Sequence, residues 1–553
     1  MSRLLEDVEF LVVFRFKPPS VQFSAAELIT DEGEAGQMEK FLAKHSDRIL
    51  GVLSGFDRMI FRGCIRQLMF EAGMSMYLYC QGVLLKEFKD FAPYISDELK
   101  TMTRKQAEDQ RRPFIYLQGD CGSKEKMARE IMERDGISEG LVCVLSTLEP
   151  CYSYKVVGNR ATEKLEVRRV YTKCLHLYQY WNDPLFGLVH GRIQTWYPFD
   201  LQFYINGREF LKNQLDHKNI SYKKADNCFT WVSDFAAANE LLKKQVSFNW
   251  QKTLDKWAIA MNPIFSDIFP MGQSYYWTLG QSEWATDVLF DSAKALSQIY
   301  PSLIHHSMVT FKSPDILKFL GKQLTLDEKI HGRFKGEVLS DFKHRLEGVR
   351  VKHSSQGNSV KIYDKAGSAL RIETTINRPA EFKSFRPKLS TGELEWQSMR
   401  KSIDDIPRRA EVSQKINERH LSALATANTD QKFMALIDGI ANPIRRDQLR
   451  VRGLDPFGKD RKILDTIING QFHITGFRNR DIRTKLFNSQ NPDDIKRSSA
   501  KVSRWLRMLR AHGLIKKVPK THRYLMTERG IQILSALKTI ENTTINDLLK
   551  LAA

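Results

Sequence analysis

The pattern of hydrophobic and polar positions divides this 553-residue chain into helical and strand-like regions. Helical spacing of apolar residues predicts helices over residues 38–56 and 277–296, whereas stretches rich in β-branched and aromatic residues predict strands over 139–232 and 344–387. We therefore expect a multidomain α+β protein with a mixed α/β body, an antiparallel β meander and a separate C-terminal module. The expected regions are an N-terminal extension (1–37), a mainly helical region (38–138), a β-rich region (139–232), a second helical region (233–343), the β meander (344–387), a helix and linker (388–454) and the C-terminal module (455–553).

Residues 1–37 lack a clear period. They are expected to be a loosely attached extension, or to precede a true start at Met38.

The C-terminal module contains a regular succession of predicted elements. Within the third of its helices, Val502, Leu506 and Leu509 form an apolar stripe at helical spacing, and cations occupy other positions. Thr527 is placed to cap the last helix. The elements are helices over 459–468, 478–487 and 495–511, strands over 514–518 and 522–526, and a closing helix from residue 527.

Three helices, a basic hairpin and a closing helix resemble a winged helix-turn-helix, and the residues that carry the resemblance are RWLRMLRAHGLIKKVPKTHRYLMTERG. The resemblance implies that the helix over 495–511 enters the major groove of duplex DNA and that the hairpin contacts phosphates or the minor groove. The alternative is a winged helix that binds protein, which the cations of the helix and hairpin disfavour. The predicted DNA-binding residues are Lys496, Arg497, Lys501, Arg504, Arg507, Lys516, Lys517, Lys520 and Arg523.

The distribution of charge agrees with a nucleic-acid partner at this end of the chain. The whole chain has a formal net charge of +20. Residues 431–553 hold 25 Lys and Arg against 11 Asp and Glu, a net of +14, and the first 430 residues hold only the remaining +6. A solvated surface would spread the excess more evenly, so the concentration favours a dedicated module for a polyanion.

A membrane location is not expected. No segment offers about 18 uncharged apolar residues in succession, and the start of the chain lacks the order of a signal peptide. The seven cysteines include no pair at zinc-ligand spacing, so they are expected to be reduced thiols. We predict a cytoplasmic, nucleoid-associated protein.

The β meander carries the most informative chemistry of the body. Residues 344–377 predict three short strands with turns at 354–357 and 366–368. Alternation places Lys361, Tyr363 and Lys365 on one face of the second strand, opposite Val360 and Ile362. On the third strand, Arg371, Glu373 and Thr375 share a face and Leu370, Ile372 and Ile376 share the other.

The polar face of the meander has two interpretations. Glu373 can hold a divalent metal, while Lys361, Lys365 and Arg371 can hold a phosphodiester and stabilise its transition state. Tyr363 can act as a nucleophile on phosphorus or position DNA. The alternative is a surface ladder of opposite charges.

The run NSVKIYDK followed by LRIE resembles the Y-x-K…R-x-E strand pair of rolling-circle replication initiators of the plasmid and phage type. The resemblance covers about 20 residues. It implies a metal-dependent DNA-nicking site with Glu373 as a metal ligand and Tyr363, Lys365 and Arg371 as further site residues. In that family the nucleophilic tyrosine lies on or after the R-x-E strand, but here the next tyrosine is Tyr524.

Two further patterns are candidate sites in the body. On the helix expected over 277–296, Glu283, Asp287 and Asp291 are four residues apart, so they would share a face and could ligate Mg²⁺ or Mn²⁺. The alternative is a solvated acidic face. In the β-rich region, aromatic residues interleave with cations, which is typical either of a stacking surface for single-stranded DNA or RNA or of a β core.

Two functions fit these patterns. The first is a DNA-processing protein of a mobile element or replicon, with Mg²⁺ or Mn²⁺ as cofactor, in which the C-terminal module docks duplex DNA and the body nicks or holds a strand. The absence of a P-loop, an HExxH and a GxSxG motif argues against an ATPase, a zincin or an α/β-hydrolase. The second is a non-catalytic DNA-binding regulator or replication factor whose large body binds a partner or RNA.

Overall fold

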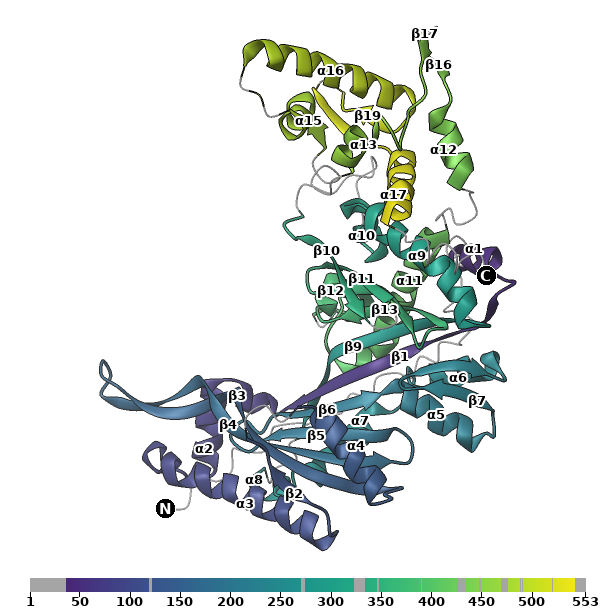
Figure 1. Ribbon diagram of the computed structural model, residues 1–553. Helices are drawn as coiled ribbons and strands as arrows, with labels where there is room; N and C mark the ends of the chain where they lie inside the picture. The colour runs from purple at the N-terminus through teal and green to yellow at the C-terminus, as the bar shows by residue number, and fades with distance from the viewer. Residues whose placement is uncertain are drawn as a thin grey trace, which may run out of the picture.

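The computed structural model is built around one eleven-stranded sheet (Figure 1). The strands follow the order β10-β11-β12-β13-β9-β1-β6-β5-β4-β3-β2, and β2 and β3 are the one parallel pair among these described strands. The mixture of helices and strands around this large sheet confirms the α+β prediction. The structure describes residues 36–118, 122–269, 274–322, 334–345, 348–388, 390–425, 433–446, 449–468, 476–487, 489, 491–519 and 521–542.

The strands of the central sheet are β1 (Ile49–Cys64), β2 (Phe114–Tyr116), β3 (Gly140–Asn159), β4 (Lys164–Asp183), β5 (Gly187–Gln194), β6 (Leu201–Asn206), β9 (Tyr276–Phe290), β10 (Val338–Arg345), β11 (Gly348–Ser355), β12 (Asn358–Lys365) and β13 (Ala369–Ile376). Two small antiparallel pairs lie outside it, β7 (Tyr222–Ala225) with β8 (Cys228–Val232) and β14 (Lys383–Pro387) with β15 (Leu394–Ser398). The helices of the body are α1 (Gly36–Lys44), α2 (Glu71–Cys80), α3 (Phe88–Asp109), α4 (Lys124–Arg134), α5 (Gly207–His217), α6 (Phe235–Lys244), α7 (Trp250–Met261), α8 (Phe265–Ile268), α9 (Ala293–Val309), α10 (Ser313–Phe319) and α11 (Ile406–Ala425).

Strand β1 lies at the middle of the sheet, between β9 and β6. The helix predicted over residues 38–56 is therefore wrong beyond Lys44, where α1 ends. Every second residue of β1 from Leu53 to Gly63 is buried, which is the period of a strand. Three of those buried positions are Gly55, Asp57 and Gly63, so the alternation is not visible as an alternation of hydrophobicity.

Strand β9 corrects a second prediction. A helix was expected over residues 277–296, but β9 occupies this stretch as far as Phe290, and α9 begins only at Ala293. All residues of β9 from Ser282 to Phe290 are buried. A strand that is buried on both faces lacks the alternation that distinguishes a strand from a helix in the sequence.

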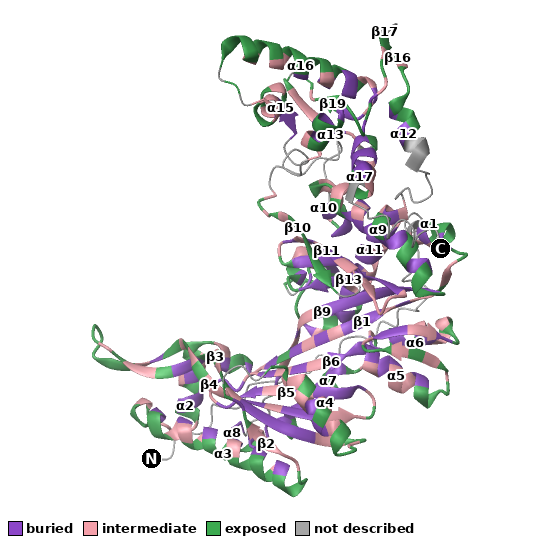
Figure 2. Cartoon of the chain, in the orientation of Figure 1, coloured by how far each residue is buried: buried purple, intermediate pink, exposed green. Residues whose placement is uncertain are grey.

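Different layers cover the two faces of the sheet around β9 (Figure 2). On one face, Val288, Ile362 and Ile372 pack in a core to which α1, α9 and α11 contribute. Asn417 of α11 binds this face by donating to the carbonyl oxygen of Trp284, at 3.2 Å. On the other face, Leu53 and Leu289 pack with residues of α5 and α6, and the polar residues of this face form the candidate site.

The three strands predicted over residues 344–377 are present as β11, β12 and β13, with β10 as an additional edge strand. The β-rich region contributes β3 to β6, and the helix expected to follow it is α5. Within this half of the sheet, α2, α3 and α7 share one large core with β1, β5 and β6, and α4 packs in a smaller core against β3.

The C-terminal module has its own hydrophobic core, formed by residues between Ile437 and Leu537. The predicted helices and strands are present with small changes at their ends, while residues 1–35, Asn469, Gly470 and Lys520 lie outside the described residues. The fold name, a winged helix-turn-helix, stays a prediction. The elements of this end of the chain are α12 (Phe433–Ala441), β16 (Ile444–Arg446), β17 (Leu449–Val451), α13 (Arg461–Ile467), β18 (Phe477–Arg478), α15 (Asn479–Leu486), α16 (Pro492–Ala511), β19 (Ile515–Lys517), β20 (Arg523–Met526) and α17 (Glu528–Asn542).

Candidate metal centre

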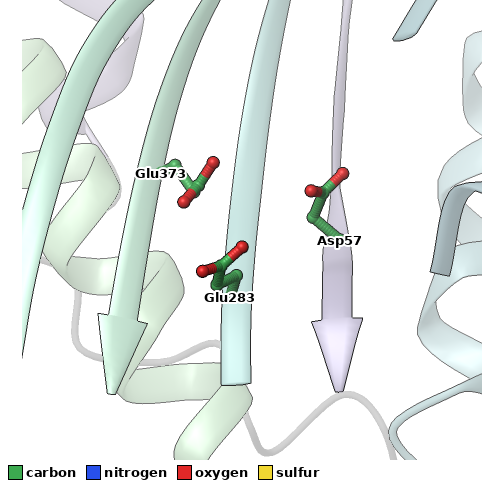
Figure 3. Close-up of side chains that lie close together, drawn as sticks. All are labelled: Asp57, Glu283 and Glu373. Carbon is green, nitrogen blue, oxygen red and sulfur yellow. The ribbon is translucent and has the colours of Figure 1, made fainter. Parts of the chain in front are cut away.

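Three carboxylates from three neighbouring strands meet at the middle of the sheet (Figure 3). Asp57 lies on β1, Glu283 on β9 and Glu373 on β13, and all three are buried. One oxygen atom from each side chain lies within 4.8 Å of the others. In the part of the chain that the structure describes, no other group of three His, Cys, Asp or Glu side chains comes this close. We call these three residues the acidic triad.

Strand register and a β-bulge bring the triad together. On β13, Glu373 lies opposite Ala285 of β9, which is two residues along β9 from Glu283 and shares its face. On β1, Phe56 pairs with Trp284 and Arg58 pairs with Glu283, so the register shifts at Asp57, which lies between them. Bulges of this kind redirect side chains and are frequent beside active sites.

Glu373 is bonded by the two residues that the sequence predicted beside it. Lys361 of β12 lies directly opposite, with Nζ 2.5 Å from Oε1 of Glu373, and the Tyr363 hydroxyl donates to Oε2 at 2.6 Å. Burial by itself raises the pKa of Glu373, but the charge and the hydrogen bond of Lys361 outweigh it and leave the pKa below its ordinary value. Glu373 is therefore ionised at neutral pH.

Glu283 has weaker cationic partners. Lys361 Nζ lies 3.9 Å from its Oε1, and Arg58 Nε lies 3.6 Å from its Oε2. Burial, together with the nearby charge of Glu373, raises the pKa of Glu283 above its ordinary value, against the opposite effects of Lys361 and Arg58. Glu283 is therefore the triad carboxylate whose ionised form is least favoured by its surroundings.

A second set of buried charges lies beside the triad. Arg371 donates to both oxygens of Asp287, at 2.6 and 2.9 Å, and to Oδ1 of Asp57 at 3.0 Å. Arg208 of α5 lies 2.9 Å from Asp287 and 3.5 Å from Asp57. Asn227, in the turn between β7 and β8, donates to Asp57 at 3.0 Å.

Asp287 therefore binds arginines and does not join the triad, although it was predicted as a metal ligand with Glu283. On a strand the two residues share a face, but four residues span about 13 Å, whereas a helix would have brought them together. Burial raises the pKa of Asp287 by itself, but Arg371 and Arg208 outweigh it and lower the pKa. Asp291 lies beyond β9 and accepts a hydrogen bond from Ser292 at the start of α9.

Tyr363 and Lys365 occupy the predicted face of β12 in different surroundings. Tyr363 is only 8% exposed, and burial with the charge of Glu373 raises the pKa of its phenol well above the ordinary value. The hydroxyl is therefore neutral and directed at Glu373. Lys365 turns away from the triad to an ion pair of 3.0 Å with Asp226, between β7 and β8.

A groove of about 820 Å³ runs over the ends of β10 to β13 beside the triad, and it is lined by Glu283 of the triad and by Lys361, which pairs with Glu373. Its wall is polar, with Ser, Asn, Gln and Thr side chains between the charged ones. Its other cations are Lys335, Lys352 and Arg378, none of which forms an ion pair with a described carboxylate, and its other acid is Glu337. The groove therefore suits an anionic chain.

The triad fits a hard divalent cation by its donors. Carboxylate oxygens are the ligands that Mg²⁺ and Mn²⁺ prefer, and each residue of the triad offers one such oxygen within 4.8 Å of the others. The ammonium group of Lys361 lies between Glu373 and Glu283 in this structure. Because Lys361 also lines the groove, its side chain has space to move aside for a cation.

The sequence had indicated Glu283 and Glu373 but missed Asp57, Arg208 and Asn227. Asp57 directly follows the helix predicted over residues 38–56 and falls in the region expected to be mainly helical, and the only local signal for it was an acidic residue beside a largely apolar run. Arg208 follows the N-cap of α5 and Asn227 lies in a short turn, so neither belongs to a motif.

The predicted DNA-binding cations line the outside of the C-terminal module. Lys496, Arg497, Arg504 and Arg507 are exposed on α16 at helical spacing, and no described carboxylate pairs with them. Lys501 lies over the rings of Phe487 and Trp505, at 5.5 and 5.0 Å. Lys516 and Lys517 are exposed on β19, and Arg523 is half-buried at the start of β20.

No helix among the described residues is both long and apolar enough to cross a membrane. Comparisons of the chain with protein-family models, with curated proteins and with solved structures found no match.

Proposed function

We propose that this chain is a metal-dependent DNA-processing enzyme of a mobile element or replicon, which cleaves a phosphodiester at the acidic triad and is held on duplex DNA by a C-terminal winged helix-turn-helix. The observation that carries the proposal is the buried triad of Asp57, Glu283 and Glu373 beside a groove with cationic walls. Bound Mg²⁺ or Mn²⁺ would supply the Lewis acidity that phosphodiester cleavage uses.

The side chains of the site have separate roles in this proposal. Lys352, Lys361 and Arg378 bind the phosphates of a strand in the groove and balance the charge that develops on phosphorus. Arg371 fixes Asp57 through its hydrogen bond at 3.0 Å, and Tyr363 fixes Glu373 through its hydrogen bond at 2.6 Å.

Tyr363 is better suited to orient Glu373 than to attack phosphorus. Its phenol is buried and neutral. Lys361, two residues earlier on β12, lines the groove, whereas Tyr363 does not. In the nucleophilic alternative, the Tyr363 oxygen would bond to phosphorus, its proton would pass to Oε2 of Glu373, and the bond from phosphorus to the leaving sugar oxygen would break. That alternative leaves a covalent protein–DNA product, so it can be tested directly.

Contacts at the C-terminal end support a rigid DNA-binding helix. Asn479, the first residue of α15, donates to the Ser499 carbonyl at 2.9 Å and to the Ser503 hydroxyl at 2.8 Å. These bonds fix α16 against the preceding helix, while Lys496, Arg497, Arg504 and Arg507 of α16 remain exposed.

Incubation with supercoiled plasmid and Mn²⁺ or Mg²⁺ tests the proposal. We expect the full chain to relax the plasmid, and Asp57→Asn, Glu283→Gln and Glu373→Gln each to abolish relaxation. Glu240→Gln, at an exposed carboxylate on α6, is the matched control. Relaxation that persists in all three triad variants would contradict the site. A labelled DNA fragment that stays attached to denatured wild-type protein, but not to Tyr363→Phe, would assign the nucleophile to Tyr363.

One observation favours a non-catalytic DNA-binding protein instead. Each carboxylate of the triad already has a cation nearby: Arg371 for Asp57, Lys361 for Glu373 and, more weakly, Arg58 for Glu283. A buried ion network with no metal would look similar. Under this alternative the wild-type chain binds DNA but does not relax the plasmid with any divalent cation.

A further inference from the structure

The β3–β4 hairpin extends from the sheet as an arm, which we define as residues 150–173 (Figure 1). Strand β3 pairs with β4 over its whole length, from Gly140 to Asn159. Strand β4 pairs with β5 only from His176 to Asp183. The arm is therefore a two-stranded ribbon that no third described strand extends, and near its base the carbonyls of Tyr152 and Tyr154 accept hydrogen bonds from Gln194 and Trp196 of the body.

Two tyrosines of the arm are exposed where the other aromatic residues of the β-rich region are mostly buried. Tyr152 is 56% exposed and Tyr171 is 66% exposed, and they lie directly opposite each other on the two strands. Their ring centroids are 5.1 Å apart. The neighbouring Tyr154, by contrast, is buried and donates to the Leu68 carbonyl at 2.8 Å. Tyr152 and Tyr171 thus form an aromatic surface that contributes little to the core.

The arm is also strongly basic. It contains six lysines and arginines and two glutamates. Its one ion pair between described residues joins Arg168 to Glu166, at 3.6 Å. The guanidinium of Arg169 lies 4.8 Å from the centre of the Tyr152 ring, so cation and aromatic surface are adjacent. The remaining exposed cations are Lys155, Arg160, Lys164 and Lys173.

We propose that this arm binds single-stranded DNA, whose unpaired bases stack on Tyr152 and Tyr171 and whose phosphates contact the surrounding cations. Every base has an aromatic face, and exposed aromatic rings among cations are the usual elements of a surface for single strands. In a duplex the bases are already stacked on one another, so the two tyrosines would have no role. The choice of DNA over RNA rests on the proposed function, in which a cleaved strand must be held.

Binding of a fluorescent single strand of about 16 nucleotides, the upper length for such surfaces, tests the proposal by anisotropy. The full chain is used with EDTA and without divalent metal, so the result does not depend on cleavage. We expect Tyr152→Ala with Tyr171→Ala to weaken binding at least about tenfold, and Tyr152→Phe with Tyr171→Phe to bind as the wild type does. Tyr79→Ala, at a tyrosine of α2 that is 80% exposed, is the matched control. Circular dichroism establishes that each variant is folded.

Competition with unlabelled duplex and with unlabelled RNA separates the other partners. Equal affinity of the wild type and the folded alanine pair would overturn the proposal. The assignment to single strands would also fail if Tyr152→Ala with Tyr171→Ala weakened binding of duplex DNA as much as binding of the single strand. The assignment to DNA would fail if RNA competed better than DNA of the same sequence. If the wild-type chain does not relax the plasmid, but the double alanine variant binds the single strand more weakly than the wild type does, the proposal for the arm stands and the proposed enzymatic function fails.

Discussion

At the scale of single residues, Arg371 connects the largest number of site groups. Its guanidinium donates to Asp287, to Asp57 and, at 3.0 Å, to the carbonyl of Asn227. Asp57 and Asp287 are buried, Asp287 completely, and Asn227 is partly buried. The arginine therefore orients Asp57 through a hydrogen bond and lowers the pKa of Asp287 by its charge.

We expect Arg371→Met to lower the free energy of unfolding by about 3–5 kcal/mol, because removal of one partner leaves buried carboxylates uncompensated. Urea denaturation followed by circular dichroism measures the change. Lys365→Met is the control, since Lys365 pairs with the exposed Asp226 and its loss should cost about 0–1 kcal/mol. Similar losses in the two variants would mean that the Arg371 network does not stabilise the fold.

Glu283→Gln should remove the stabilisation of the fold by Mn²⁺ without lowering the stability of the metal-free chain. The raised pKa of Glu283 means that the folded chain holds the proton of Glu283 more tightly than the unfolded chain does. Stability is therefore lost as the pH rises from the pKa of Glu283 in the unfolded chain through its higher pKa in the folded chain. In EDTA at neutral pH, we expect Glu283→Gln to melt at the same temperature as the wild type or higher. Mn²⁺ should raise the melting temperature of the wild type and leave that of Glu283→Gln unchanged.

The effect of Mn²⁺ on the wild type should also shrink as the pH falls toward the raised pKa of Glu283, because protons then compete with the metal. Differential scanning calorimetry with and without Mn²⁺, over a series of pH values, measures both effects. Equal stabilisation of the wild type and Glu283→Gln by Mn²⁺ would exclude Glu283 as a ligand.

At the scale of elements, the sequence predicted those strands in which apolar and polar residues alternate. The alternation is clear from Val360 to Tyr363 on β12 and from Leu370 to Glu373 on β13, so it correctly placed Lys361 and Tyr363 on the face of Glu373. On β9 the residues of both faces are buried, and the helical interpretation was wrong. Asp57 could not be assigned to the site from the sequence. It lies 226 residues before Glu283, and no local pattern indicates that its strand, β1, pairs with β9.

The position of α5 depends on the absence of a side chain at Gly207. A Cβ atom there would lie 1.9 Å from the carbonyl oxygen of Phe56, at the bulge that presents Asp57. Gly207→Ala must therefore push α5 from β1 and move the next residue, Arg208, away from Asp57. We expect a loss of about 1–3 kcal/mol in unfolding free energy, typical of an overpacked contact, and weaker stabilisation by Mn²⁺.

Urea denaturation and Mn²⁺-dependent melting measure these two consequences for Gly207→Ala. Gly158→Ala, on the arm, is the matched control because a Cβ there meets no atom within 4 Å. If Gly207→Ala behaved like Gly158→Ala, the contact between α5 and β1 would not determine the geometry of the site.

At the scale of the whole molecule, charge and chemistry occupy different parts of the chain. The excess of positive charge is concentrated after residue 430, whereas the acidic triad and its arginines belong to a nearly balanced body. The arm is the basic exception within that body. A contact with duplex DNA through the C-terminal module and a contact with a single strand through the arm would let one molecule select a site and act on a strand. The duplex contact can be measured separately by its salt dependence.

Binding of the full chain to duplex DNA should weaken steeply with salt, because each phosphate contact releases condensed counterions. We expect Arg504→Ala with Arg507→Ala to reduce the slope of log K against log salt by about 1.8, the value for two lost phosphate contacts. Anisotropy titrations over a series of salt concentrations measure the slope. Lys89→Ala, at an exposed cation of α3, is the control and should leave it unchanged. A slope that stays the same in the double variant would move the duplex contact away from α16, and a slope near zero in the wild type would refute duplex binding through phosphates altogether.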